Sequence, residues 1–203
     1  MKRILIIVAL AIIAVLVLVL GVGHYKVGYV YIDGRHYEKD SQSLSLYQRD
    51  LINYDIRSLN RMTDLTSLEL SENYISDIRV LSGLKNLTNL ELPSNQISNI
   101  DALGGLIKLK TLQLNNNQIE DISALSGLKH LTYLELAGNQ ICDISALSEL
   151  TNLKTLDPSG NNISDTSALI GLTNLNVLYI LGNQITDISA LEAALPRCMI
   201  IWE

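Results

Sequence analysis

Hydrophobic and polar residues recur on a fixed schedule from residue 65 to residue 191. Aligned on six asparagines that stand 22 residues apart, the chain repeats L-x-x-L-x-L-x-x-N-x-I, followed by a second half close to D-I-S-A-L-x-x-L. Leu and Ile supply nearly all of the apolar positions, and the chain has no Phe. An exact repeat of this kind predicts a solenoid, in which each coil buries its apolar side against the neighbouring coils.

The first half of each unit predicts a strand and a turn. Its L-x-L core alternates, so we expect leucines such as Leu68 and Leu70 to point inward and stack on the next coil. The asparagine that follows is expected inside the turn, where its amide can bond to backbone groups that no strand partner reaches. The sequence therefore predicts a buried structural ladder at Asn73, Asn95, Asn117, Asn139, Asn161 and Asn183.

An Asp or Asn opens the second half of every unit. Because Asx side chains are good helix caps, we expect each one to act as the N-cap of a short turn, of the 3₁₀ type, on the side opposite the strands. Isoleucines such as Ile78 and Ile122 should close the core from that side. A metal or acid–base array is the alternative interpretation, and capping is the one we favour. The column consists of Asp77, Asn99, Asp121, Asp143, Asp165 and Asp187.

The pattern is irregular in two places. Pro158 replaces an inward leucine and removes a backbone donor, and Thr166 replaces the isoleucine of the same unit, so residues 157–166 should be a local weak point. A degenerate first unit precedes Leu65: Leu44 and Leu46 match L-x-L, and Arg49 takes the place of the asparagine. Irregular terminal units are expected because they cap the stack.

Both ends of the repeats predict covering elements. Residues 29–32 and 35–37 read as a hairpin around Asp33-Gly34, a pair that accepts the positive φ angles of a type I′ turn. Residues 195–202 read as a final strand. The predicted layout is an N-terminal anchor at 1–23, a linker and capping hairpin at 24–43, repeats at 44–191 and a C-terminal cap at 192–203.

The first 23 residues predict a membrane segment. Two basic residues, Lys2 and Arg3, precede twenty apolar residues, 4–23, and a helix of that length spans about 30 Å, the thickness of the hydrocarbon core. We expect an uncleaved transmembrane helix with its N-terminus in the cytoplasm and the repeats outside. The alternative is a secreted protein after signal cleavage near Gly21-Val22-Gly23, although the apolar run is long for a signal peptide.

Charge and motifs exclude several classes of function. The net charge is −6, with seven basic and fifteen acidic side chains in residues 65–203, which argues against nucleic acid as a partner. The three histidines and two cysteines form no metal or catalytic spacing, and no nucleotide or hydrolase motif is present. We therefore predict no enzyme, no cofactor, no metal and no small-molecule substrate.

The outward positions of the strands are the predicted partner site. The side chains between the two strand leucines, together with their neighbours, run from acidic in the early coils to aromatic and apolar in the late ones. We expect Tyr133 and Tyr179 to anchor a protein partner that carries basic residues; the alternative is that these polar side chains only keep the face soluble. The predicted binding residues are Glu69, Glu91, Gln113, Tyr133, Glu135, Asp157, Val177, Tyr179 and Leu181.

With its N-x-I-x-D-I-S-x-L units, the chain resembles the internalin-type leucine-rich repeats of bacterial surface proteins, from about Leu44 to Leu191. The resemblance implies a curved leucine-rich-repeat solenoid with a parallel β-sheet on its concave face, 3₁₀ turns on its convex face, and protein binding, often to host receptors. The chain is shorter than the large family members and has no L-P-x-T-G signal, which the membrane anchor would replace. We expect a membrane-tethered extracytoplasmic protein–protein interaction module; the alternative is an envelope scaffold that binds itself or a neighbouring membrane protein.

Overall fold

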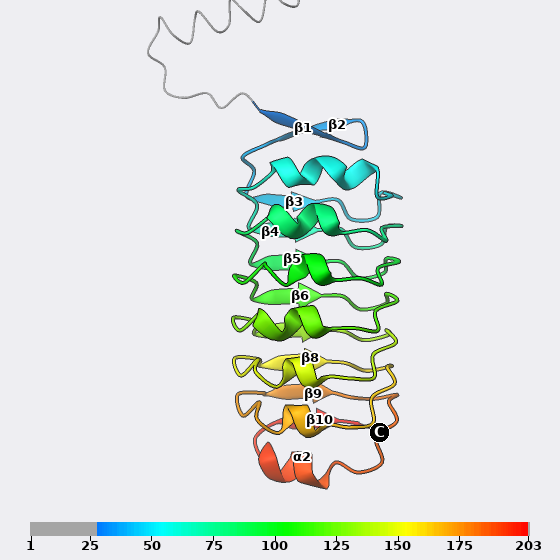
Figure 1. Cartoon of the computed structure of the whole chain (residues 1–203), viewed down its shortest axis with the longest axis vertical. Helices are drawn as coiled ribbons and strands as arrows, with labels where there is room; N and C mark the ends of the chain where they lie inside the picture. Colours follow the sequence, from blue (N-terminus) through cyan, green and yellow to red (C-terminus); the bar gives the residue numbers. More distant parts are fainter. Residues whose placement is uncertain (1–27, 203) are drawn as a thin grey trace, which may run out of the picture.

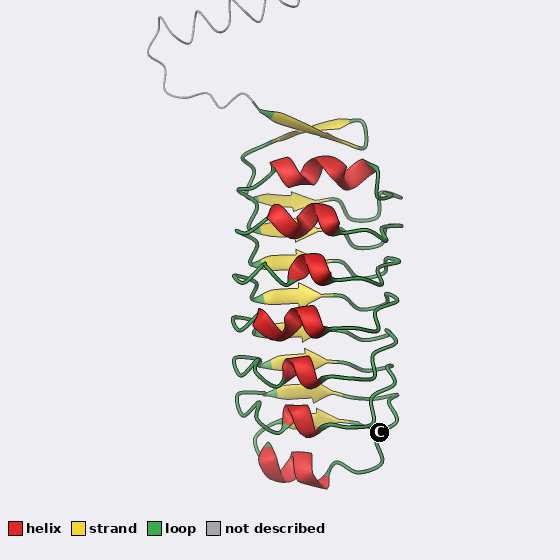
Figure 2. Ribbon diagram, viewed as in Figure 1, coloured by secondary structure: helices red, strands yellow, loops and turns green. Residues whose placement is uncertain are grey.

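The computed structural model describes residues 28–202, which wind into one stack of coils (Figure 1). Each coil places a three-residue strand on one side of the stack and a short helical turn on the other (Figure 2). The leucine-rich-repeat solenoid with a parallel sheet and 3₁₀ turns is thereby confirmed. The strands of the coils are β3 (Ser43–Ser45), β4 (Ser67–Glu69), β5 (Asn89–Glu91), β6 (Thr111–Gln113), β7 (Tyr133–Glu135), β8 (Thr155–Asp157), β9 (Val177–Tyr179) and β10 (Met199–Ile201).

The eight strands form one parallel sheet in chain order, from β3 at one edge to β10 at the other. Equivalent residues of consecutive coils stand opposite each other, as in the series Leu68, Leu90, Leu112. All three leucines are at most 1% exposed, and a fully buried Leu stabilises a fold by about 1.5–3 kcal/mol. The 22-residue period thus produces a sheet in which the same side-chain position is repeated strand after strand.

The asparagines join neighbouring coils. The Asn95 Nδ2 donates to the carbonyl oxygen of Leu70 in the preceding coil at 2.9 Å and to that of Leu92 in its own coil at 3.1 Å. Its Oδ1 accepts the backbone N–H of Ile75 at 3.0 Å. The same arrangement recurs along the stack, so the buried amides have partners for both ends of the side chain.

The turns opposite the sheet are 3₁₀ helices in six coils and an α-helix in the last. They are η1 (Asp55–Arg61), η2 (Arg79–Gly83), η3 (Asp101–Leu103), η4 (Ser123–Gly127), η5 (Ser145–Leu147), η6 (Ser167–Leu169) and α2 (Ser189–Ala194). The α-helix departs from the expected 3₁₀ turn because its Leu-Glu-Ala-Ala sequence favours the α conformation, and Glu192 N–H accordingly bonds to the carbonyl of Ile188.

The Asx column caps these turns from one position earlier than predicted. The residue that directly precedes η5 is Ile144, which makes no side-chain cap. Instead, the Asp143 Oδ1 accepts the N–H of Ser145 at 2.8 Å, and the Asn99 Oδ1 accepts the N–H of Asp101 at 2.9 Å. The capping function holds, but it uses an Asx turn that reaches over the isoleucine, because the isoleucine must point into the core.

The expected irregularity at Pro158 is confined to one hydrogen bond. One coil earlier, Leu136 N–H bonds to the carbonyl of Asp157, and Gly160 N–H resumes the pattern by bonding to Leu181. Because Pro158 has no N–H, the bond that position 158 would give to the carbonyl of Tyr179 is missing. The pairing of β8 with β9 therefore ends at Leu156. Thr166 is half-buried, whereas the equivalent isoleucines are buried.

Each end of the stack carries a covering element. The strands β1 (Tyr29–Ile32) and β2 (Arg35–Glu38) form an antiparallel hairpin whose turn residues Asp33 and Gly34 have φ angles of 49° and 69°. Val30 and Ile32 are buried against the first coil. At the other end β10 extends the sheet. Cys142 and Cys198 are both free thiols.

The predicted membrane segment 1–23 lies outside the described residues. Among residues 28–202, no helix is long and apolar enough to cross a bilayer. The boundaries of the four predicted regions stay a prediction.

Candidate functional site

The outward side of the parallel sheet carries the predicted partner residues in three columns, which we call the sheet face. The strand register places Glu69 beside Glu91, Gln113 beside Glu135, and Glu135 beside Asp157. Tyr133 stands between Thr111 and Thr155, and Val177 lies next to Thr155. All nine predicted residues are half-buried, with their side chains partly open to solvent. The first column consists of Ser67, Asn89, Thr111, Tyr133, Thr155 and Val177, the central column of Glu69, Glu91, Gln113, Glu135, Asp157 and Tyr179, and the third column of Ser71, Pro93, Asn115, Ala137, Ser159 and Leu181.

The central column brings like charges together. Neighbouring parallel strands are about 4.8 Å apart, and two carboxylates at about that distance repel each other by about 1 kcal/mol even in water. Burial, followed by the charges of Glu69 and Glu135, raises the pKa of Glu91 above its ordinary value. The repulsion between neighbouring carboxylates of the sheet face therefore costs free energy, and a cationic group on a partner would relieve it.

The carboxylates of the sheet face have no cationic partner within the described part of the chain. The ion pairs among residues 28–202 are Arg79 with Asp77 and Lys129 with Glu149, and both lie outside the three columns. Glu69 accepts a hydrogen bond from the Ser45 hydroxyl at 2.5 Å, and Asp157 accepts the N–H of Ser159 at 2.9 Å. These neutral donors leave the negative charge of the face uncompensated.

The two tyrosines differ in their surroundings. The Tyr133 hydroxyl donates to a carboxylate oxygen of Glu135, and this bond, with burial and the nearby acids, raises the pKa of Tyr133 to about 12. Its ring is thereby fixed next to the acidic column. Tyr179 lies in β9, two residues after Val177, and its carbonyl receives no ladder bond from Pro158. The Tyr133 ring is thus held by a hydrogen bond, whereas the unpaired Tyr179 carbonyl lies in the plane of the sheet, directed at the coil of Pro158.

Further unsatisfied polar atoms lie in the third column. The Asn115 Oδ1 and the Ser159 Oγ are buried atoms without a hydrogen-bond partner. Because both atoms are buried, the acceptors that a ligand can reach on this face are its carboxylates. A complementary ligand must therefore supply hydrogen-bond donors, as Lys and Arg side chains do.

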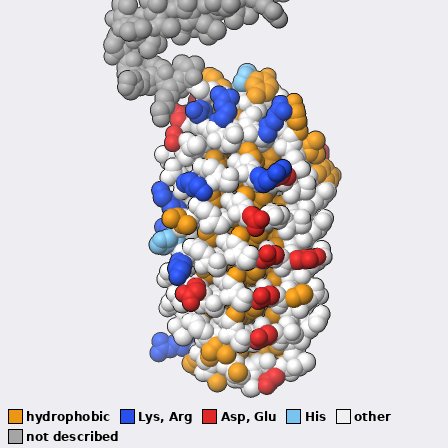
Figure 3. All heavy atoms as spheres, viewed as in Figure 1, with side chains coloured by type: hydrophobic (Ala, Val, Ile, Leu, Met, Phe, Trp, Pro, Cys, Tyr) orange, Lys and Arg blue, Asp and Glu red, His pale blue; other side chains and the backbone are white. Residues whose placement is uncertain are grey.

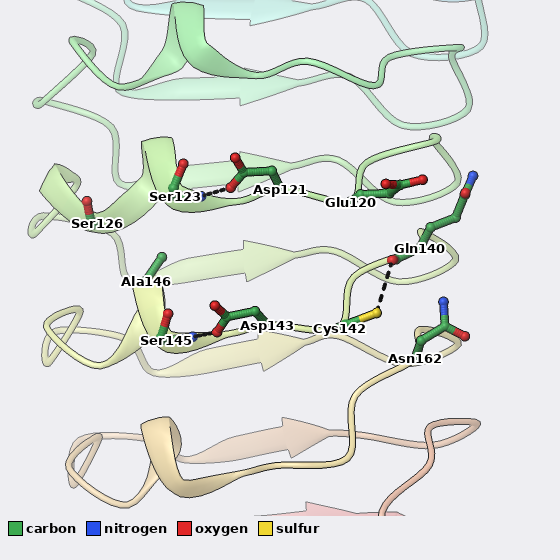
Figure 4. A pocket seen from close by; sticks show the side chains of 10 residues that line it. All are labelled: Glu120, Asp121, Ser123, Ser126, Gln140, Cys142, Asp143, Ser145, Ala146 and Asn162. Carbon is green, nitrogen blue, oxygen red and sulfur yellow. Dashed lines mark hydrogen bonds between the residues drawn. The ribbon is translucent and has the colours of Figure 1, made fainter.

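A shallow groove of about 920 Å³ lies on the helical side of the stack, between η4 and η5 (Figure 4). Two of its three carboxylates are occupied, because Asp121 and Asp143 accept the N–H groups of Ser123 and Ser145 at 2.7 Å and 2.8 Å. The Cys142 thiol contacts the carbonyl of Gln140 at 3.9 Å. Within residues 28–202 no three His, Cys, Asp or Glu side chains form a metal-binding group. Two capping aspartates and the residues around them line the groove, and we do not treat it as the functional site.

Sequence reasoning missed a second group of aromatic side chains. The most exposed tyrosines lie in the early part of the chain, at Tyr29, Tyr31, Tyr47, Tyr54 and Tyr74. The alternation Tyr-Val-Tyr-Ile in the first strand was the available signal, since it places both tyrosines on one face of the hairpin. The aromatic character of the molecule is thus not restricted to the late coils of the sheet face.

Comparison with known proteins gives the family. Residues 85–127, 107–149 and 151–193 match the family of leucine-rich repeats (2 copies). Among solved structures, an internalin (inlF) of Listeria monocytogenes has 35% sequence identity and a TM-score of 0.66 over 72% of this chain and 50% of its own. Internalin C2 of the same species has 30% identity and a TM-score of 0.66, over 84% of this chain and 86% of its own.

More distant structures share the fold. A leucine-rich-repeat protein of Leptospira interrogans has 25% identity and a TM-score of 0.67, over 70% of this chain and 38% of its own. A plant peptide hormone receptor, RGFR1 in complex with RGF2, has 18% identity and a TM-score of 0.67, over 82% of this chain and 33% of its own. At this identity the likeness shows only that the two chains share a fold. The search of curated proteins found no match. The repeats, the parallel sheet and these relatives place the chain in the leucine-rich-repeat family, as an internalin-type protein.

Proposed function

We propose that this chain is a membrane-tethered extracytoplasmic module that binds a protein partner through its sheet face, and that the partner contributes Lys or Arg side chains. One observation carries the proposal: the carboxylates of the sheet face have no cationic partner within residues 28–202. Leucine-rich-repeat proteins serve as protein–protein interaction modules, and their domains are typically without enzymatic activity.

The arrangement of the side chains on the face supports binding of the partner in a single orientation. Acidic side chains predominate from Glu69 to Glu135, and Val177, Tyr179 and Leu181 form the apolar end. Rigid aromatic side chains are typical anchors of interfaces, whereas charges steer the approach of the partner and fix its orientation. A partner with a basic segment followed by an apolar one would bind in a single direction along the sheet.

The tether is supported by the sequence. The apolar run 4–23 follows two basic residues, a pattern typical of a helix with its N-terminus in the cytoplasm. Proteases added to intact cells should then remove the repeats, and full protection would contradict the outside location. Cleavage and secretion would instead release the repeats into the medium.

The test of the binding face compares alanine variants of the full chain. Partners are captured by cross-linking on intact cells, and affinities are then measured with the captured protein. Tyr133→Ala with Tyr179→Ala should weaken binding at least about thirtyfold, the effect of losing about 2 kcal/mol at an interface hot spot. Tyr74→Ala is the matched control, because this tyrosine is 55% exposed and lies outside the three columns.

The outcomes separate binding from mere solubility of the face. Glu69→Ala, at the acidic end, should weaken binding much less than the double tyrosine variant. Equal losses for Tyr74→Ala and for the double variant, or no loss for either, would rule out the sheet face as the binding site.

A second candidate is an envelope scaffold that binds its own copies. The observation in its favour is β10, whose outer edge has no strand partner among the described residues and whose Met199 is 63% exposed. An apolar edge strand without Lys or Pro is a template for pairing with another chain. Light scattering of the purified full chain in detergent decides between the two: a stable dimer that Ile200→Lys dissociates favours the scaffold.

A further inference from the structure

We propose that the outer face of the β1–β2 hairpin docks on the headgroup layer of the membrane, so that the solenoid stands end-on on the bilayer. This inference rests on the proposed membrane anchor and adds a second contact between the chain and the lipid. The hairpin lies at one end of the stack, opposite to α2 and β10 (Figure 1).

The hairpin has two different faces. Val30 and Ile32 are at most 1% exposed and pack toward the first coil. Because side chains alternate along a strand, Tyr29 and Tyr31 point away from the stack, and they are 55% and 56% exposed. The exposed His36 ring lies edge-on against both, at centroid distances of 5.9 Å and 4.3 Å. Three rings in edge-on contact therefore lie on this outer face, beside the exposed Glu38 that pairs with Tyr29.

Such a surface is unusual for a cap. A terminal unit needs a polar outer face to keep a repeat protein soluble, yet here aromatic side chains take the outermost position. Tyrosine is amphipathic, with an apolar ring and a polar hydroxyl, and it is enriched where membrane proteins cross the headgroup layer. A membrane surface thus accounts for the exposed rings better than bulk water does.

The length of the connection places the hairpin near the lipid. Only residues 24–27 separate the end of the apolar run from Gly28, where the described structure begins. Four residues extend over at most about 14 Å, and the headgroup layer adds about 5–7 Å beyond the hydrocarbon core. If residues 4–23 span the bilayer, the hairpin must lie at or just above the headgroups.

The charge distribution favours an upright orientation. Residues 24–64 contain six basic and six acidic side chains, whereas residues 65–203 contain seven and fifteen. Basic side chains gather near the hairpin end and acidic ones farther along the face drawn in Figure 3. An anionic bilayer therefore repels the repeats more than the hairpin end. An end-on solenoid keeps the sheet face away from lipid and open to a partner.

The test uses the full chain in vesicles of phosphatidylcholine and phosphatidylglycerol, with a nitroxide quencher on the lipid headgroups. Tyr31→Trp is the probe, and Tyr74→Trp is the matched control, because the two tyrosines are 56% and 55% exposed. Both variants retain Trp202, which lies after β10 at the far end, as an internal reference. We expect the Trp at position 31 to lose most of its emission and those at positions 74 and 202 to lose little.

A flexible insertion between Val27 and Gly28 separates docking from the short connection. If the hairpin binds lipid, the quenching at position 31 persists in the lengthened chain and is lost when Tyr29→Ser and His36→Ser are added. If only the connection holds the hairpin near the bilayer, the insertion alone reduces the quenching to that of Tyr74→Trp, and the proposal is overturned. The melting temperature of each variant confirms folding.

Flotation of the vesicles distinguishes this proposal from the anchor on which it rests. A chain that fails to float overturns both. A chain that floats without quenching at position 31 keeps its anchor and loses only the docking contact. If such a chain is also dimeric by light scattering, the tyrosine face binds a second copy instead of lipid.

Discussion

Pro158, the residue after β8, has no N–H to donate to the carbonyl of Tyr179 in β9, although every comparable coil of the described chain makes this bond. The equivalent bond one coil earlier, from Leu136 N–H to Asp157, is present, and so is the next bond between the same two coils, from Gly160 N–H to Leu181. The loss is therefore a single missing donor in an otherwise continuous sheet. It lies at the apolar end of the sheet face, where we place part of the partner site.

Pro158→Leu should restore this bond. A net hydrogen bond contributes about 1 kcal/mol, and the loss of proline's rigidity in the unfolded chain offsets part of it, so the gain in melting temperature is small. Hydrogen exchange is the sharper measurement, and the new amide at position 158 should be protected. Pro93→Ser is the matched control, because the ladder bonds there come from Leu92 and Ser94; an unprotected amide at position 158 would refute the assignment.

Asn117→Ala should destabilise the solenoid strongly. The substitution leaves the Ile97 N–H buried without its side-chain partner, and it removes one of the two asparagine donors from the carbonyls of Leu92 and Leu114, which keep Asn95 and Asn139. An unsatisfied buried N–H costs about 1–3 kcal/mol and each lost hydrogen bond about 1 kcal/mol, so the free energy of unfolding should fall by about 3 kcal/mol. Urea unfolding measures it. Gln118→Ala, at the exposed neighbouring position, should change little, and a similar loss in both variants would disprove the ladder's contribution.

Glu91→Gln should stabilise the fold at neutral pH and weaken the binding of a basic partner. A raised carboxyl pKa means that the ionised form is disfavoured in the folded state, so stability decreases as the pH rises from the ordinary value of 4.5 through the raised one. The amide removes this cost, and the neighbouring strand already carries an amide at this position, Gln113. The expected gain is about 0.5 kcal/mol or less, and it should vanish below pH 4.5. Glu120→Gln, which is exposed and off the sheet face, should show no gain.

Asp143→Asn should make the fold less sensitive to acid. The N–H and the hydroxyl of Ser145 lower the pKa of Asp143 below its ordinary value of 3.8. A lowered pKa contributes stability that is fully present above pH 3.8 and is lost as the pH falls through the folded-state value. Asparagine keeps the acceptor without the titration, as Asn99 does. The melting temperature of the Asn variant should therefore fall less between neutral and acidic pH than that of the unchanged protein. Asp143→Ala should lower the melting temperature at every pH.

Most of the fold could be read from local pattern. Each coil repeats the same contacts with its neighbours, so the inward leucines, the asparagine ladder and the Asx column all follow from a fixed spacing in the sequence. The effect of Pro158 could be predicted for the same reason, since a missing N–H removes one hydrogen bond from any ladder. The position of the capping residue could not be predicted, because only the packed structure shows that Ile144 turns into the core and that Asp143 reaches over it.

The site divides in the same way. The order of side chains along the sheet face follows from the repeat, and the 22-residue spacing alone places Glu69, Glu91, Glu135 and Asp157 in one column. The tertiary structure was needed for three other features: the absence of cationic partners within residues 28–202, the bond from Tyr133 to Glu135, and the exposure of Tyr29 and Tyr31 at the end of the stack. Register is a property of spacing along the chain, whereas pairing and exposure depend on distances between coils, which no single repeat contains.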